Sequence, residues 1–302
     1  MSSAAPERPP ADRWRDVDGI LLLDKPEGLT SNAALQRVRR AFRARKAGHT
    51  GSLDPLASGL LPVCFGQATK ASGMLLDADK TYHVAIALGE RTATGDREGE
   101  VVERAPVPGL DEESVRRIAA GFLGESQQVP PMYSALKHRG ERLYRLARQG
   151  IEVERPPRRI VIQRLELAGM EPGRLQFEVD CSKGTYVRSL AEDIARACGT
   201  VGHVHSLEAV EGAADQPQEL QAMLLPADAA IPGLPALHLG VAEQACVLQG
   251  QPVFVAGPGA ALVRMYGADG LFLGVGRMSA EGLRLAPERI MVSLAAEPSS
   301  RA

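Results

Sequence analysis

Long apolar runs are missing from this 302-residue chain, and none approaches the roughly 18 residues that a membrane-spanning helix needs. Cysteine is scarce as well: the four residues Cys64, Cys181, Cys198 and Cys246 lie far apart and form no C-x-x-C pair. This usage predicts reduced, buried thiols in a cytoplasmic protein and argues against disulfides. The first fourteen residues mix charges with prolines and lack the apolar stretch of a signal peptide, so we expect a disordered leader over residues 1–14.

Motifs for cofactors and for common hydrolytic sites are also missing. The chain has neither a Walker A motif nor a G-x-G-x-x-G loop, and no G-x-S-x-G surrounds any serine. His203 and His205 lie two residues apart on a predicted strand and present two metal ligands, but a third ligand nearby is absent. We therefore expect no metal and no nucleotide cofactor.

Charge is low overall but unevenly distributed. The net charge is −2, yet residues 31–52 hold six basic residues and no acid, and residues 137–164 hold nine basic residues against three acids. Residues 208–232, by contrast, contain five acids and no lysine or arginine. A single basic run is usually a solvated surface, and two such runs also suit contacts with phosphates.

The pattern of apolar residues predicts a mixed α+β fold rather than a doubly wound sheet. The expected strands are 19–24, 80–88, 159–167, 175–181 and 202–207, with 159–167 and 175–181 pairing antiparallel. The expected helices are one capped by Thr30 or Ser31, one from Asp111 to a terminating Gly124, one near 141–148, and one after Lys183-Gly184-Thr185 that ends at Gly199.

The last part of the chain reads differently. Residues 213–235 shift to Ala, Pro, Gln and acids, which predicts a linker. Short strands with Gly and Pro turns follow at 251–255, 261–266, 271–276 and 283–285, which is typical of a small β-barrel.

One carboxylate raises a question of function. Asp54 lies in KAGHTGSLDPLASGLLP, among glycines, prolines and aliphatic residues. An Asp-Pro pair usually caps a turn or a helix start, and the local sequence alone does not favour chemistry over capping.

Four long segments change the interpretation. They are GHTGSLDPLASGLLPVCFGQATK, KTYHVAIALGERTATGDREGEV, QVPPMYSALKHRGERLYRLARQGIEV and CSKGTYVRSLAEDIARACG. In order, and over about residues 19–207, they resemble the bacterial tRNA pseudouridine synthase B family. The resemblance implies a pseudouridine synthase catalytic domain over residues 15–212 with an insertion at about 128–155. Its sheet would be mixed and largely antiparallel with flanking helices, and residues 236–295 would form a PUA-like RNA-binding domain.

The resemblance also implies an activity and a site. The family isomerises uridine 55 in the T loop of tRNA by flipping the base, with an aspartate and without a cofactor. Asp54 matches the catalytic aspartate, Tyr82 the tyrosine that packs on the base, and Arg188 the arginine that pairs with the aspartate. Further matches that line the site or contact the RNA are His49, Asp96, Lys183, Tyr186 and Leu207.

The resemblance implies a monomer that binds the T stem-loop of tRNA, with no membrane, guide RNA or protein partner required. Whether the aspartate attacks the base or assists loss of the base from C1′ stays open. After Leu207 the family continues with two arginines, whereas this chain reads Glu208-Ala-Val-Glu-Gly212. That departure leaves two alternatives: an RNA-binding or RNA-folding protein with weak or lost catalysis, and a guide-dependent relative, which the long insertion disfavours.

Overall fold

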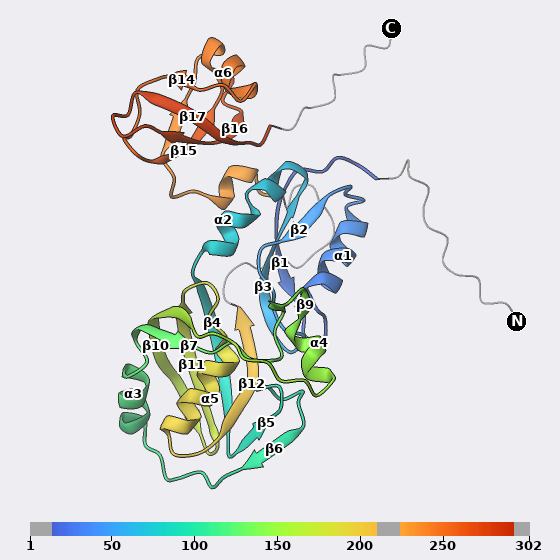
Figure 1. Ribbon diagram of the computed structural model, residues 1–302, viewed down its shortest axis with the longest axis vertical. Helices are drawn as coiled ribbons and strands as arrows, with labels where there is room; N and C mark the ends of the chain where they lie inside the picture. Colours follow the sequence, from blue (N-terminus) through green and yellow to red (C-terminus); the bar gives the residue numbers. More distant parts are fainter. Residues whose placement is uncertain (1–13, 210–223, 293–302) are drawn as a thin grey trace, which may run out of the picture.

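The computed structural model describes residues 14–209 and 224–292, which form a large mixed α+β part and a small β part (Figure 1). The predicted leader, except for Trp14, lies outside the described residues, as does the first half of the predicted linker. No helix within the described ranges is long and apolar enough to cross a membrane.

An eight-stranded sheet forms the centre of the large part, with the order β1-β3-β12-β4-β11-β10-β7 and β2 paired to β3. All its pairings are antiparallel except β3 with β12. The mixed, largely antiparallel sheet is confirmed. The strands are β1 (Gly19–Lys25), β2 (Ala47–His49), β3 (Ser58–Phe65), β4 (Lys80–Leu88), β7 (Gly124–Gln128), β10 (Arg158–Glu171), β11 (Arg174–Cys181) and β12 (Gly202–Ala209).

The first helix, α1 (Ser31–Ala41), packs on the β1–β3 end of the sheet. The Thr30 hydroxyl accepts a hydrogen bond from the Ala33 amide and so caps the helix. Leu35 and Phe42 are buried against β1 and β3, and the arginines face away from them. Because Thr30 supplies the cap, Ser31 is available for another contact.

Two other helices cover one face of the remaining strands, where the main hydrophobic core lies. They are α3 (Glu112–Ala120), capped by Asp111, and α5 (Val187–Ala197). The predicted α3 is too long at its end, since Gly124 begins β7 instead of terminating the helix. Short elements complete this part: η2 (Gly66–Lys70), α2 (Ser72–Asp77), β5 (Glu90–Thr92) and β6 (Val101–Arg104).

The segment between β7 and β10 forms the insertion. It contains β8 (Lys137–His138), β9 (Glu141–Arg142) and α4 (Leu143–Arg148). Leu143 and Leu146 of α4 are buried, and the Arg155 guanidinium donates to the Pro130 carbonyl across the neck of the segment at 3.3 Å.

The small part is a curled five-stranded sheet with the order β13-β15-β16-β17-β14 and its own core. Its elements are β13 (Ala236–His238), α6 (Val241–Leu248), β14 (Val253–Phe254), β15 (Leu262–Tyr266), β16 (Phe272–Met278) and β17 (Arg284–Ile290). The pattern analysis anticipated four of these strands and missed β13 and α6.

The second half of the predicted linker is packed against both parts of the molecule. Leu225 pairs with Ile20 of β1, and η3 (Ala227–Ala230) follows. Ile231 is buried in a cluster with Ala71 of the large part and Val275 of the small part. Apolar residues of this segment therefore pack at the junction between the two parts.

Among the described residues of this sheet, β3 and β12 share fewer residue pairs than any other two neighbouring strands. Within residues 14–209, two residue pairs join these strands, Ser58 with Glu208 and Gly59 with Ala209. Gly59 has a φ of +92°, and a Cβ atom there would lie 2.2 Å from the Ala209 carbonyl oxygen. This seam joins the strand that follows Asp54 to the strands that carry Tyr82 and Leu207.

We predict that Gly59→Ala lowers the free energy of unfolding by about 3 kcal/mol, because it adds a steric clash to backbone strain. Urea denaturation measures the loss. Gly173→Ala is the matched control: Gly173 has a φ of +73° with open space around it. The control is expected to cost about 1 kcal/mol, and equal losses in both variants would contradict the tight seam.

Candidate active site

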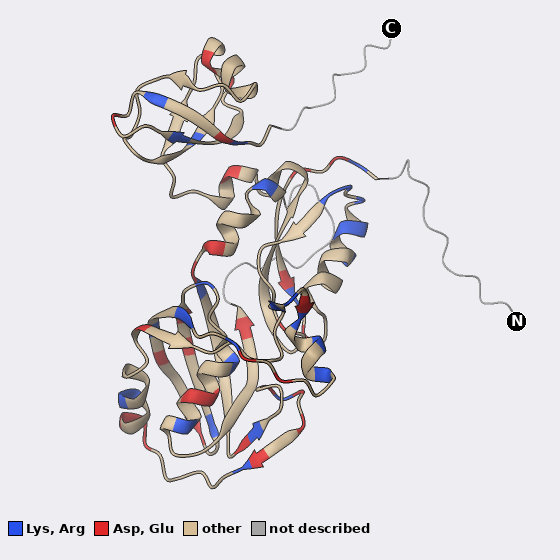
Figure 2. Ribbon diagram, viewed as in Figure 1, with Lys and Arg blue, Asp and Glu red and all other residues tan. Residues whose placement is uncertain are grey.

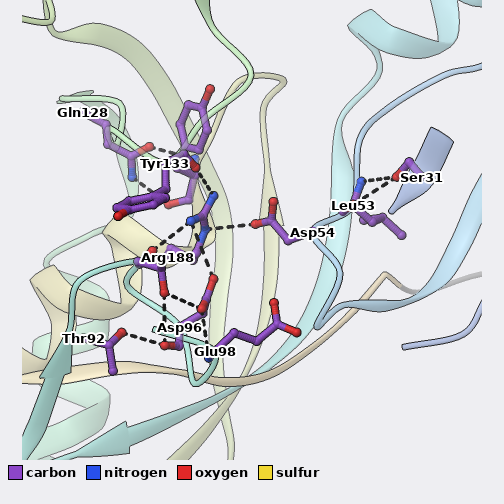
Figure 3. Close-up of polar contacts among 11 residues, drawn as sticks. Ser31, Leu53, Asp54, Thr92, Asp96, Glu98, Gln128, Tyr133 and Arg188 are labelled. Atoms are coloured by element: carbon purple, nitrogen blue, oxygen red, sulfur yellow. Dashed lines mark hydrogen bonds and ion pairs between the residues drawn. The ribbon is translucent and has the colours of Figure 1, made fainter. Parts of the chain in front are cut away.

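Asp54 is held in a turn directly before β3. The Ala57 amide donates to the Asp54 carbonyl at 3.0 Å, and the Gly28 amide donates to the Pro55 carbonyl at 2.8 Å. The buried Ser31 hydroxyl donates to the Leu53 carbonyl at 3.0 Å and accepts from the Leu53 amide at 2.8 Å (Figure 3). The turn expected from the Asp-Pro pair is present, and α1 fixes the residue that precedes the carboxylate.

Arg188, the second residue of α5, lies opposite this carboxylate. Its Nε lies 2.9 Å from Asp54 Oδ2 in an ion pair. The other guanidinium nitrogens donate to two backbone carbonyls, Nη1 to Thr94 at 2.8 Å and Nη2 to Tyr133 at 2.7 Å. The Arg188 side chain is 7% exposed and that of Asp54 is 39% exposed, so the carboxylate retains an open side.

Asp96 completes the charge balance from the loop after β5. Its Oδ2 lies 3.6 Å from Arg188 Nη1, and its side chain is 6% exposed. Asp96 Oδ1 accepts from the Thr94 hydroxyl at 2.6 Å and from the Glu98 amide at 3.1 Å (Figure 3). Asp96 therefore holds its own loop in shape and contributes a second negative charge beside Arg188.

A cavity of about 530 Å³ opens next to Asp54 and Arg188. This volume is within the range of small-molecule sites. Tyr82 on β4 lines it, half-buried. Burial raises the pKa of Tyr82, and the charge of the Asp54 carboxylate adds to the rise, so its phenol stays neutral near pH 7.

The remaining residues expected at the site fall into two groups. Lys183, Tyr186 and Leu207 line the cavity with Asp54, Tyr82 and Arg188, although the Lys183 ammonium pairs with Asp77 at 2.8 Å. His49 and Asp96 are not in the cavity wall. The Nδ1 atom of His49 is buried and has no hydrogen-bond partner among the described residues.

Three residues support the site without having been anticipated there. Ser31 clamps Leu53, and Lys25 is fully buried with its ammonium bound to the Pro26 and Leu29 carbonyls. Gln128, at the start of the insertion, donates to the Tyr186 carbonyl at 3.1 Å and accepts from the Tyr186 amide at 2.8 Å. Of these three residues, Lys25 alone belongs to a recognisable local motif, the turn Lys25-Pro26-Glu27-Gly28.

The electrostatics of Asp54 combine opposing effects. Burial raises the pKa of Asp54, the Arg188 guanidinium opposes that rise, and the nearby Asp96 adds to it. Burial also lowers the pKa of Lys25, and the charge of Asp54 opposes that change. The site thus offers one partly exposed carboxylate, a buried cation paired with it, and a neutral aromatic ring that lines the same cavity.

The described residues do not support a metal site or a reactive cysteine. His203 Nδ1 lies 2.9 Å from the Glu90 carbonyl oxygen, and the described part of the chain contains no cluster of three His, Cys, Asp or Glu side chains suited to a metal ion. Burial raises the pKa of Cys64 and of Cys181 to about 11, which keeps both thiols protonated.

Comparison with known proteins identifies the family. Residues 39–187 match the model for the N-terminal domain of the TruB family of pseudouridylate synthases, and residues 235–291 match the C-terminal domain model of TruB, pseudouridine synthase II. The chain belongs to the TruB family.

Relatives with this family's name match nearly the whole chain. The tRNA pseudouridine synthase B of Nitrosococcus oceani is 49% identical over 298 residues, which cover 92% of this chain and 96% of that protein. The tRNA pseudouridine synthase B of Hydrogenovibrio crunogenus is 46% identical over 288 residues, covering 92% and 95%. The family assignment makes the protein a pseudouridine synthase, an isomerase.

Solved structures agree on the fold. The crystal structure of a Cbf5-Nop10-Gar1 complex matches with a TM-score of 0.70 at 22% identity, covering 94% of this chain and 88% of that chain. An H/ACA RNP bound to a substrate RNA containing 2′-deoxyuridine matches with a TM-score of 0.67 at 21% identity, covering 91% and 85%. At such identities the likeness concerns the fold alone.

One departure from the expected TruB sequence lies at the seam of the sheet. The two arginines expected after Leu207 are absent there, and Glu208 and Ala209 pair with β3. The residues from 210 to 223 lie outside the described part of the chain. An arginine of another loop, Arg97, reaches β12 and donates to the His205 carbonyl at 3.1 Å.

The raised pKa of Asp54 predicts a stability effect in this TruB protein. Its ionised form is less favourable in the folded protein than in the unfolded chain, so the cost is full above the folded-state pKa and vanishes below the unfolded-state pKa. We expect Asp54→Asn to raise the thermal unfolding midpoint at pH 7, with the gain disappearing below about pH 4. Arg188 keeps Asp96 and two carbonyls as partners in the variant.

Asp111→Asn supplies a control of opposite sign, because the Ser114 amide lowers the pKa of this capping carboxylate. Its ionised form favours folding above about pH 4, so the variant is expected to unfold at a lower temperature at pH 7. Thermal unfolding followed by circular dichroism between pH 3 and pH 8 measures both. A lower midpoint for Asp54→Asn at pH 7 would contradict the assigned environment.

Proposed function

We propose that this protein isomerises uridine 55 in the T loop of tRNA to pseudouridine, with Asp54 as the reacting carboxylate and without a cofactor. The observation that carries the proposal is the Arg188–Asp54 ion pair of 2.9 Å beside a cavity lined by Tyr82. The tRNA substrate follows from the names of the relatives, which are tRNA pseudouridine synthases.

The proposed reaction rearranges bonds without oxidation. The N1–C1′ bond breaks, the uracil turns, and a C5–C1′ bond forms; C5 loses its proton and N1 gains one. Asp54 acts on the nucleotide, either by adding to the base or by assisting its loss from C1′. The permanently charged Arg188 favours the ionised carboxylate against the effect of burial, and Tyr82 stacks on the detached ring.

Base flipping explains why the protein would need an extended basic surface. Extruding a stacked base costs a few kcal/mol, and contacts with the RNA backbone must offset that cost. The exposed Arg37, Arg40 and Arg43 around α1 have no carboxylate partner among the described residues, and neither do Arg145 and Arg148 of α4. Figure 2 shows basic residues along both helices. These arginines support binding to the phosphates of a tRNA stem-loop.

The proposal includes a monomer that acts in the cytoplasm without a guide RNA. The insertion between Gln128 and Arg155 supports the stand-alone form, because it brings its own basic residues to the RNA. The alternative that the protein binds or folds RNA with little catalysis is favoured by one observation, the Glu208-Ala209 pair where two arginines are expected.

We expect Asp54→Asn to lose turnover by about 10³-fold or more while keeping its affinity for tRNA, since the carboxylate acts on the base and phosphate contacts dominate binding. Release of tritium from C5 of uridine in unmodified tRNA transcript measures turnover, and filter binding measures affinity. Asp193→Asn, which removes an exposed carboxylate of the same helix as Arg188, is the control and should retain full activity.

The outcomes separate the two functions. Equal turnover by the wild type and Asp54→Asn would refute the assigned carboxylate. Tight tRNA binding by the wild type without any tritium release would select the RNA-binding alternative, and activity only in the presence of further components would exclude the stand-alone form.

A further inference from the structure

Ser134, at the base of the insertion, has a hydroxyl that the fold leaves unsatisfied. Its amide donates to the Met132 carbonyl at 2.9 Å, and its carbonyl accepts from the Tyr144 amide at 3.1 Å. The Oγ atom is buried and has no hydrogen-bond partner among the described residues, and the residue as a whole is 5% exposed. The backbone at this position is therefore complete, and only the hydroxyl lacks a partner.

Such a hydroxyl needs a physical explanation. Burying a polar group without a partner costs roughly 1–3 kcal/mol, and an alanine in its place would avoid that cost. Four other residues have a buried side-chain atom in the same condition: His49, Gln67, Arg155 and Thr200. Of the five, Ser134 alone lines the cavity beside Asp54.

The position of Ser134 is tied directly to the reacting groups. The preceding residue, Tyr133, accepts a hydrogen bond of 2.7 Å from Arg188, and the same guanidinium pairs with Asp54 at 2.9 Å. Ser134 is thus one residue away from a contact that also fixes the carboxylate. The residue also lines the cavity, so an occupant of the cavity lies beside it.

The surroundings suit a neutral ligand rather than a phosphate. The Arg188 charge is engaged by Asp54 and Asp96. Of the cavity's lysines, Lys183 pairs with Asp77, and the Lys80 ammonium donates to backbone carbonyls of residues 75–78. A hydroxyl that both donates and accepts matches the carbonyls and the N3–H of a uracil edge.

We propose that the Ser134 hydroxyl donates a hydrogen bond to a carbonyl oxygen of the target uracil and holds the ring both before and after it turns. The inference rests on the proposed isomerisation of a tRNA uridine. A half-turn of uracil about the axis through N3 and C6 exchanges N1 with C5 and also exchanges O2 with O4. A donor placed at one carbonyl position therefore finds a carbonyl there in the substrate and again in the product, and loses its partner only while the ring is between the two.

The first experiment compares Ser134→Ala with the wild type in single-turnover tritium release from tRNA. The loss of one hydrogen bond to the base predicts a rate about tenfold lower. The affinity for tRNA should stay within about twofold, because phosphate contacts dominate it. The thermal unfolding midpoint should stay equal or rise, because the variant removes an unsatisfied group.

Thr200→Val is the matched control. Thr200 has an equally buried hydroxyl without a partner, is also 5% exposed, and lies outside the cavity wall. It should leave the rate unchanged.

A second experiment identifies the ligand group. Sulfur accepts hydrogen bonds weakly, so tRNA carrying 2-thiouridine or 4-thiouridine at the target position weakens one carbonyl at a time. Because the turn exchanges O2 with O4, each substrate places sulfur at Ser134 in one of the two ring orientations. At least one of them should slow the wild type, and the same substrate should slow Ser134→Ala by a smaller factor, since the variant lacks the hydroxyl that makes the contact.

The results distinguish failure of this inference from failure of the proposed function. Wild-type turnover together with an unchanged rate in Ser134→Ala would overturn the Ser134 contact alone. The partner of the hydroxyl would then be a bound water molecule. Fully additive effects of sulfur and Ser134→Ala would also overturn it. Absence of turnover by the wild type would overturn both.

Discussion

The Arg188 guanidinium is buried in the large part of the molecule, and the arrangement of the site depends on how it is satisfied. A buried cation without partners is strongly unfavourable, and Arg188 finds two carboxylates and two carbonyls on segments that are distant in sequence. Those segments are the turn before β3, the loop after β5 and the base of the insertion. Satisfying one side chain therefore brings the Asp54 carboxylate, a second acid and the cavity wall together.

The central sheet positions three residues that line the cavity beside Arg188. Asp54 precedes β3, Tyr82 lies on β4 and Leu207 on β12, so the pairing of β3 with β12 sets the position of the carboxylate relative to the other two side chains. Glu208 and Ala209 lie at this seam, directly after Leu207, where the resemblance led us to expect arginines. Because both residues make backbone pairs with β3, the departure leaves the seam formed while it changes the charge there.

Local pattern was sufficient for much of the fold. The alternation in β4 and the capped, amphipathic α1 were predicted correctly, because each depends on near neighbours in sequence. Helix α6 was missed because Val247 is its only fully buried residue, which leaves little periodic signal. The packing of residues 224–235 was missed because Ile231 is buried by residues remote in sequence, Ala71 and Val275, which leave no local pattern.

The residues of the site also differ in how much of their role a local sequence pattern reveals. Asp54 looked like a turn residue by spacing, and only the resemblance paired it with Arg188, which is remote in sequence. The Ser31 clamp spans 22 residues and the Gln128 clamp spans 58, and neither leaves a local pattern. The most direct test of the account maps pseudouridines in tRNA from cells that lack this protein and carry either the wild type or Asp54→Asn. The account predicts that pseudouridine at position 55 is lost without the protein and restored only by the wild type; pseudouridine 55 that persists without the protein, or returns with Asp54→Asn, would contradict it.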